Sequence, residues 1–235
     1  MIDKFVLKIK RADTPFYSFL NRLAKSLIAF NLPAIRVVHL PLYYFDYFLR
    51  TAIPHVFHVL WSVPLFKARC ESVGRNLRLP NGIPLIIGSH LKIYLGDNVT
   101  IGRSTIGASK IFDEPRLTIG NNTNVGYGTT ISVAKEVTIG DHCLIGPGCT
   151  IMDSDDHPLS PRKRLLRDPV AKEDVQAVQI GNNVWIGSNV LILKGVVIGD
   201  NSVIAAHSVV TKRIDSNCVY AGYPARPTMR EIDKL

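Results

Sequence analysis

The residue best suited to catalysis in this sequence is His157, which follows three carboxylates in the segment DSDDHP at residues 153–158. A histidine side chain changes charge close to neutral pH, so it can remove a proton from a substrate at that pH. A neighbouring carboxylate can fix the tautomer of the ring and stabilise its cation. The pattern therefore indicates a general base. The alternative is a solvated turn in which Asp side chains accept hydrogen bonds from backbone amides.

A second group of candidate residues is basic. Lys212, Arg213 and Arg226 lie near the end of the chain, and Lys194 precedes them. Charged groups of this kind bind phosphate oxygens through charge-assisted hydrogen bonds, so the cluster favours a phosphorylated ligand. A solvated basic rim is the competing interpretation.

The histidines do not predict a metal site. A zinc-dependent solenoid enzyme of the carbonic-anhydrase type needs three histidines that converge, and among the histidines of the repeat region only His142 and His157 lie close together in the chain. The histidines other than His157 are assigned to the surface or to packing: His39, His55, His58, His90, His142 and His207.

The elements that must position these residues are revealed by an unbroken period of six. Aliphatic residues occupy every sixth position from Ile180 to Val210, and the same unit recurs upstream between Leu95 and Ile151. Gly usually follows the aliphatic residue, and a small or β-branched residue stands four positions after it. Neither a helix nor a single strand has this period, whereas a hexapeptide period is a signature of a parallel β-helix.

We therefore predict an all-β solenoid of triangular cross-section. Each hexad makes one flat face and one corner, so three hexads of about 18 residues in total close one coil. Aliphatic residues stack inside, glycine relieves the backbone at the corner, and small residues such as Cys143 and Cys149 fill the narrow interior.

The period also divides the chain into parts. Residues 1–72 contain no hexads and are predicted to form an amphipathic, aromatic helical extension. Residues 73–214 form the solenoid, which a protruding loop at residues 152–179 interrupts, and residues 215–235 form a C-terminal tail. A long excursion from a compact domain is usually functional or disordered, so the loop is a candidate for function.

The charge of the chain favours an anionic partner. Its 28 basic and 19 acidic residues give a formal charge of +9 over 235 residues, which suits a nucleic acid, a phosphorylated ligand or a membrane surface. No nucleic-acid-binding motif accompanies the charge, so nucleic acid is not predicted. The scattered cysteines and an N-terminus without the features of a secretory signal indicate a cytoplasmic protein with reduced thiols.

The N-terminal extension combines basic residues with Trp, Tyr, Phe and Leu, as helices lying in the plane of a membrane surface do. Its uncharged run between Arg50 and Lys67 is too short and too interrupted by proline to span a bilayer comfortably. We interpret the extension as a peripheral anchor on the inner face of the cytoplasmic membrane. Packing as a cap on the open end of the solenoid, or in a subunit interface, is the alternative.

The sequence resembles the hexapeptide-repeat O-acyltransferases, and within them most closely the maltose/galactoside acetyltransferase group and its polysaccharide-modifying relatives. The likeness covers residues 74–230 and rests on DSDDHP, the loop that follows, IGNNVWIGSNVLILKGVVIGDNSVIAAHSVVTK, and AGYPAR. This resemblance implies a left-handed parallel β-helix, a homotrimer, and acetyl-CoA as the donor, bound in the cleft between adjacent subunits.

The resemblance also implies roles for individual residues. His157 would take a proton from an acceptor hydroxyl as that oxygen attacks the thioester, and it would later return a proton to the CoA thiolate. Relatives differ in the acidic residue that accompanies this histidine, and we favour Asp155 over Asp153 and Asp156. Asn124 and Asp153 would bind the acceptor, and the donor would be held by Trp185, Ser188, Ala205, Ala206, Ser208, Lys212 and Arg226.

The leading hypothesis is an O-acetyltransferase that acts on a saccharide of the cell envelope, lipopolysaccharide, capsule or exopolysaccharide, including lipid-linked precursors. N-acetylation of an amino sugar would use the same base and the same donor. A third hypothesis is a non-catalytic solenoid scaffold whose loop binds a partner. The histidine and the CoA-like tail argue against that scaffold.

Overall fold

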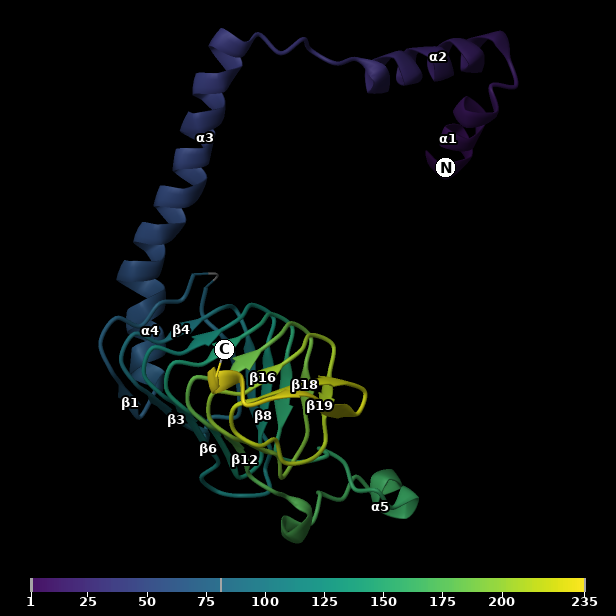
Figure 1. The fold of residues 1–235 in the computed structure, drawn as a ribbon. Coiled ribbons are helices and arrows are strands. Elements are labelled where there is room, and N and C mark those ends of the chain that lie inside the picture. The colour runs from purple at the N-terminus through teal and green to yellow at the C-terminus, as the bar shows by residue number, and fades with distance from the viewer. Residues whose placement is uncertain (1, 81, 235) are drawn as a thin grey trace. The chain divides into compact units, whose positions relative to one another are not determined.

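The computed structural model describes residues 2–80 and 82–234, which fall into two compact units that meet in the chain between Thr51 and Ala52. Helices make up the first part of the chain and strands nearly all of the rest (Figure 1). The early helical elements are α1 (Ile2–Arg11), α2 (Pro15–Ala29), α3 (Arg36–Phe57), the π-helical turn η1 (His58–Ser62) and α4 (Val63–Arg69). The later ones are α5 (Pro161–Leu165) and the 3₁₀ turns η2 (Lys172–Asp174) and η3 (Ile232–Lys234).

The strands form three parallel sheets that the chain visits in turn. Sheet A contains β1 (Ser72–Val73), β3 (Lys92–Leu95), β6 (Arg116–Ile119), β9 (Glu136–Ile139), β12 (Val178–Ile180) and β15 (Val197–Ile198). Sheet B contains β4 (Thr100–Ile101), β7 (Asn124–Val125), β10 (Leu144–Ile145), β13 (Trp185–Ile186), β16 (Val203–Ile204), β18 (Cys218–Gly222) and the antiparallel β19 (Ala225–Arg230). Sheet C contains β2 (Leu85–Ile87), β5 (Thr105–Ala108), β8 (Thr130–Val133), β11 (Thr150–Met152), β14 (Leu191–Ile192) and β17 (Val209–Val210). The predicted fold class is confirmed, because the second unit is a β-solenoid of about seven turns that matches a left-handed β-helix fold.

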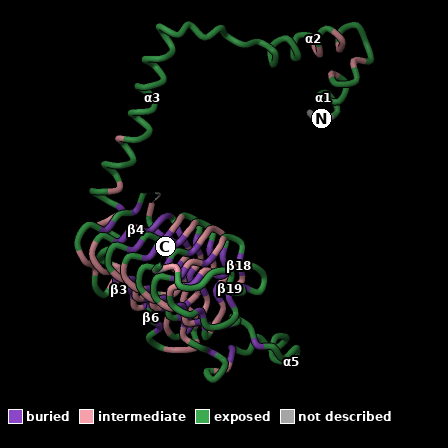
Figure 2. Tube along the Cα trace, in the orientation of Figure 1, coloured by how far each residue is buried: buried purple, intermediate pink, exposed green. Residues whose placement is uncertain are grey.

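The core of the solenoid consists of aliphatic residues stacked from coil to coil. Ile145, Ile186 and Ile204 occupy matching positions on adjacent strands of sheet B, and all three are buried. The small residues four positions further on also point inside, as Cys143 and Cys149 do. Burial of each aliphatic side chain stabilises the fold by roughly 1.5–3 kcal/mol. Because the buried positions recur in every coil, they form a continuous core (Figure 2).

The corner between sheets A and B explains the recurrent Gly-Asp/Asn-Asn sequence. The Oδ1 atom of Asn182 accepts a hydrogen bond of 2.9 Å from the backbone N–H of Asp141 in the preceding coil. A Cβ at Gly140 would lie 2.6 Å from that same oxygen, so only glycine fits there. The residue after Asn182 is Asn183, whose φ of 53° lies in the left-handed region that asparagine tolerates. Side-chain bonds between coils therefore fix the sequence at this corner.

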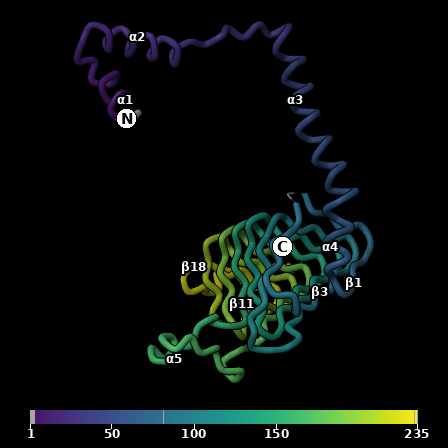
Figure 3. Tube along the Cα trace, turned by 180° about the vertical axis from the view of Figure 1, so that it is seen from behind, coloured from purple at the N-terminus to yellow at the C-terminus, as the bar shows by residue number. Residues whose placement is uncertain are grey.

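The corner between sheets C and A carries the irregular segments of the solenoid. The chain leaves the repeat between β5 and β6, gains two residues between β8 and β9, and makes its long excursion between β11 and β12. The excursion carries α5, and Figure 3 shows it projecting from the body of the solenoid. Because all three departures follow strands of sheet C, they gather along one edge.

The end of the solenoid differs from the sequence interpretation. Ile214 forms a bridge with Ile198, and β18 then pairs in parallel with β16. Residues of the expected tail at 215–235 thus continue the coil by another strand and close it with the β18–β19 hairpin, in which Tyr220 and Ala225 are buried. The sequence missed this because a six-residue period does not extend past Val210.

The start of the solenoid is capped by α4. Phe66 is 1% exposed and belongs to the solenoid core, and the Arg69 guanidinium donates to the carbonyls of Gly88, Ser89 and Leu91 at 3.0–3.2 Å. The alternative of a capping role therefore holds for this helix. Burial raises the pKa of the neighbouring Cys70 thiol to about 11.

The helices before α4 are largely solvent-exposed (Figure 2). The helices α2 and α3 contain no buried residue. The predicted helical extension is thus present. Within the described residues no helix is long and apolar enough to cross a membrane.

Candidate active site

His157 lies at the corner between sheets C and A, where β11 ends and the long loop begins. Its side chain is exposed, and its backbone N–H donates to the carbonyl of Asp155 at 2.7 Å. The next residue in the turn, Asp156, has a φ of 59°, so the chain reverses sharply just before the histidine. This turn presents the imidazole to solvent at the edge that collects the irregular segments.

The side chains of the three aspartates before His157 bond to different partners. The carboxylate of Asp155 forms an ion pair of 2.6 Å with Lys194 from the following coil. Asp156 accepts a hydrogen bond of 3.0 Å from the hydroxyl of Ser132 in the preceding coil. Among the described residues, the carboxylate of Asp155 thus pairs with Lys194 and not with the predicted partner His157, whose backbone N–H bonds the carbonyl of Asp155. The sequence could not reveal this because Lys194 lies 39 residues away.

Asp153 is a structural residue. Its side chain is fully buried, and its carboxylate accepts backbone hydrogen bonds of 2.6, 2.7 and 2.7 Å from Ala134, Lys135 and Glu136. Burial raises the pKa of Asp153, whereas the amide hydrogen bonds lower it. This corrects its assignment to the acceptor, because a carboxylate closed off in this way has no exposed surface. Asp153 instead ties the start of the loop to the two-residue insertion before β9.

A cavity of about 430 Å³ lies between the loop and the irregular segment that follows β5. His157 lines it together with Lys110, Arg164, Arg167 and Asp168. A small apolar cluster supports the wall beside it, in which Val170 and Val175 pack with Ala134 against Ile111 and Phe112. The loop is thus anchored at several points, so the cavity is a built feature of this edge.

The predicted donor residues lie mainly along sheet B and the corner that follows it. Trp185 is 57% exposed on the outer face of sheet B, in register with Leu144 and then with Asn124. The next corner brings Ser188 and Ala206 together on successive coils, because a Cβ at Gly187 would meet the backbone of Ala206 at 2.5 Å and His207 donates its N–H to the carbonyl of Ser188. Ala205 lies beside them in the same turn.

Ser208 does not line an open surface. Its side chain is fully buried, and its hydroxyl accepts a hydrogen bond of 3.0 Å from the backbone N–H of Gly222. This residue therefore holds the terminal hairpin to the last coil. Its predicted place in the donor channel is corrected accordingly.

Lys212 and Arg226 are brought together at the C-terminal end of the solenoid. Both line a cavity of about 190 Å³, which Arg213 and Tyr220 also border. Arg226 reaches the site from β19, while Lys212 follows β17 at the same edge as Lys194. Three of the four basic residues that the sequence grouped thus border one cavity, whereas Lys194 is paired with Asp155.

Within one chain, the two halves of the candidate site lie on different edges. His157 and Lys212 belong to the corner between sheets C and A, whereas Ser188 and Ala206 belong to the corner between sheets B and C. In the part of the chain that the structure describes, no three His, Cys, Asp or Glu side chains are grouped so that they could hold a metal ion.

Comparison with known proteins links this arrangement to transferases. The family model described as "Bacterial transferase hexapeptide (six repeats)" matches residues 177–212, and the "Hexapeptide repeat of succinyl-transferase" model matches residues 136–152. The galactoside O-acetyltransferase of Escherichia coli K12 is 44% identical over 115 residues, which are 49% of this chain and 54% of that protein. The polysialic acid O-acetyltransferase of Escherichia coli O1:K1 is 39% identical over 118 residues, which are 50% of this chain and 37% of that protein. The matches thus span about half or less of the length of these curated relatives.

A solved structure extends the likeness over most of the solenoid. The structure of a galactoside acetyltransferase in complex with coenzyme A superposes with a TM-score of 0.51 at 32% identity. The superposition covers 73% of this chain and 70% of that one. A second structure, of an N-acyltransferase from Bacillus cereus, has a TM-score of 0.57 at 21% identity and supports the fold alone.

Proposed function

Because the chain belongs to the hexapeptide-repeat acyltransferase family, we propose that it transfers an acetyl group from acetyl-CoA to a hydroxyl group of a saccharide. The observation that carries this proposal is an exposed histidine at a built cavity on a β-helix whose solved relative holds coenzyme A. Both curated relatives are O-acetyltransferases of saccharides, which favours oxygen as the acceptor atom.

The chain offers groups that fit coenzyme A. The cavity bordered by Lys212, Arg213 and Arg226 suits phosphate oxygens, since lysine and arginine bind these through charge-assisted hydrogen bonds. Ser188 and the two alanines Ala205 and Ala206 form a corner of small side chains along which a slender pantetheine arm could lie. Acetyl-CoA would supply the acetyl group as a thioester.

His157 is proposed as the general base. Its exposed imidazole can accept the proton of an acceptor hydroxyl bound in the cavity and so make the oxygen a better nucleophile. The Asp155–Lys194 pair and the Ser132–Asp156 hydrogen bond fix the turn that carries the histidine, so they are proposed as positioning contacts. Holding acceptor and donor in one orientation supplies much of the rate in reactions of this kind.

A homotrimer is part of this proposal. The base and the corner of small residues lie on different edges of one solenoid, so a site that uses both would be completed by an adjacent subunit. Analytical ultracentrifugation would test this. We expect a mass three times that of the chain, and a monomer that is fully active would contradict it.

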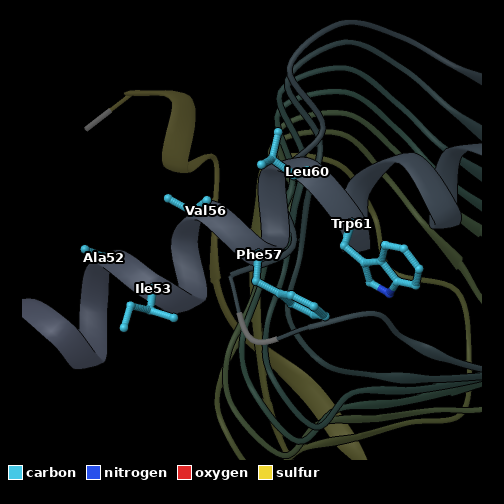
Figure 4. Close-up of a pocket in the computed structure, with 6 residues that line it drawn as sticks. All are labelled: Ala52, Ile53, Val56, Phe57, Leu60 and Trp61. Atoms are coloured by element: carbon cyan, nitrogen blue, oxygen red, sulfur yellow. The ribbon is translucent and has the colours of Figure 1, made fainter.

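The N-terminal helices are proposed as a peripheral membrane anchor. Figure 4 shows Ala52, Ile53, Val56, Phe57, Leu60 and Trp61 along one helical segment, where they form an apolar surface. Phe57 and Trp61 are 56% and 57% exposed, and the exposed Lys67 follows them in α4. Exposed aromatic residues beside cations suit the surface of anionic lipid.

Co-sedimentation with vesicles tests the anchor. We expect binding to phosphatidylglycerol vesicles that Phe57→Asp/Trp61→Asp abolishes, while Tyr223→Asp, a change at an 83% exposed aromatic residue of the solenoid, leaves binding unchanged. Equal loss in both variants, or no binding by the wild type, would remove the anchor from the proposal.

The catalytic assignment is tested with His157→Ala. Loss of a general base should lower turnover by about 10²–10⁴-fold and leave binding of acetyl-CoA unchanged. The control is His142→Asn, which removes an exposed imidazole from the corner between sheets A and B and keeps a residue type that tolerates the left-handed φ of 58°. Near-normal turnover in His157→Ala would discard the assignment. An amino sugar that is acetylated faster on nitrogen than on oxygen would favour the N-acetyltransferase alternative.

A further inference from the structure

The cavity beside His157 is lined by three cationic side chains. It is lined by Lys110, Arg164 and Arg167, against the carboxylates of Asp156 and Asp168. Across the described residues, the ion pairs of the structure include neither Lys110 nor Arg167. Asp156 is already engaged by the hydroxyl of Ser132. The cavity therefore presents positive groups that are free to meet a ligand.

The three cationic side chains of the cavity differ in their contacts with the chain. Arg164 donates from Nη1 to the carbonyls of Pro158 and Leu159, so it braces the backbone directly after the histidine. Arg167 extends from the turn after α5, and Lys110 extends from the segment after β5. These two reach the cavity from different segments, because one belongs to the loop and the other to the preceding irregular segment.

The walls that hold these cations are anchored. Val170 and Val175 are buried against Ile111, and the ammonium group of Lys172 lies 5.3 Å from the ring centroid of Phe112. Asp153 fixes the start of the loop, and the backbone N–H of Gln176 donates to the carbonyl of Asp153 at its end. The backbone that carries these cations is therefore already ordered, so ligand binding has to order only their side chains.

We propose that the acceptor saccharide carries an anionic group, a phosphate or a carboxylate, which Lys110 and Arg167 bind while its hydroxyl faces His157. This inference rests on the proposed function for the identity of the reacting hydroxyl. An arginine fork can hold either anion through two parallel hydrogen bonds, and a lysine adds a point charge. Anion binding at this position orients the sugar and adds to the specificity of transfer.

The inference is tested by ligand-observed NMR titration of the full chain with three probes. Glucose 1-phosphate offers a phosphate, glucuronic acid offers a carboxylate, and methyl glucoside is neutral. We expect one or both anionic probes to bind at least about tenfold more tightly than the neutral probe, as charge-assisted hydrogen bonds provide, and to bind less tightly as salt rises. The probe that binds better identifies the type of anion.

Variants separate the cavity from the general charge of the chain. Lys110→Gln/Arg167→Gln should abolish the preference for the anionic probe, whereas Arg162→Gln, which removes a charge from α5 outside the cavity, should keep it. Equal binding of all three probes, or equal loss in Arg162→Gln, would overturn the inference. Acetyl-CoA binding is measured in the same samples. If the wild type binds acetyl-CoA but shows no preference for the anionic probes, only the inference is contradicted. If the wild type prefers the anionic probes but does not bind acetyl-CoA, only the proposed function is contradicted.

Discussion

Asp153 provides a quantitative test of how the loop is held on the solenoid. Its Oδ1 accepts from the N–H of Ala134, and its Oδ2 accepts from those of Lys135 and Glu136. In Asp153→Asn the amide oxygen can replace Oδ2, but the NH₂ group then faces the N–H of Ala134. A buried donor without an acceptor costs about 1–3 kcal/mol, and the two remaining bonds lose their charge assistance. The neutral amide avoids the cost of burying a charge, and this offsets part of the destabilisation. We therefore expect a net loss of about 2–4 kcal/mol in the free energy of unfolding.

The measurement is urea unfolding at one fixed protein concentration, with Asp155→Asn as the matched control. That control removes a carboxylate two residues away whose ion pair with Lys194 is partly exposed, so it should cost only about 0–1 kcal/mol. Hydrogen exchange should also become faster at the amides of Ala134, Lys135 and Glu136 in Asp153→Asn alone. A loss below about 1 kcal/mol in Asp153→Asn, or the same loss in both variants, would refute the structural role of Asp153.

Three further predictions follow from the packing of the solenoid. Gly140→Ala should destabilise the fold by about 1–3 kcal/mol, since its Cβ would lie 2.6 Å from the Oδ1 of Asn182, whereas Gly107→Ala, with its nearest contact at 3.9 Å, should be close to neutral in the same unfolding assay. Phe66→Ala should cost about 3–5 kcal/mol because the ring is 1% exposed, and thermal unfolding with no change would contradict its capping role. The rate of Cys70 alkylation by iodoacetamide should keep rising up to a pH of about 11, since burial raises the pKa of the folded thiol. The unfolded thiol has a pKa near 9.0 and ionises at lower pH than the folded one, so the free energy of unfolding should fall as the pH rises from about 9 to about 11. A rate that levels off near pH 9 would contradict the burial.

The fold was predictable because each position of its six-residue repeat requires a particular type of residue. The aliphatic stack, the corner glycine and the buried small residue each depend on the six-residue period alone, and Ile186 and Cys143 lie where that period puts them. The end of the solenoid was not predictable in this way. Tyr220 is buried through the pairing of β18 and β19, and that pairing leaves no hexapeptide signal.

The candidate site was predictable only in part. The position of His157 followed from the end of a hexad, but its acidic neighbours have partners that are distant in sequence. Asp155 meets Lys194 and Asp153 meets three amides before β9, and both contacts join different coils. Lys110 was missed for the same reason. The sequence did hold one signal for Lys110: the interruption that contains it and the long loop at residues 152–179 both follow strands of sheet C, so they occupy the same position in their coils.

The most direct test of the central claim is calorimetric titration of the full chain with acetyl-CoA. We expect a dissociation constant in the micromolar range, and we expect Lys212→Ala/Arg226→Ala to raise it at least about tenfold through the loss of phosphate contacts. The control Arg162→Ala/Arg230→Ala removes two charges outside the cavity that Lys212 and Arg226 line, and it should bind like the wild type. Absence of binding by the wild type, or equal weakening in both double variants, would contradict an acetyl-CoA-dependent transferase that holds its donor at the end of the solenoid.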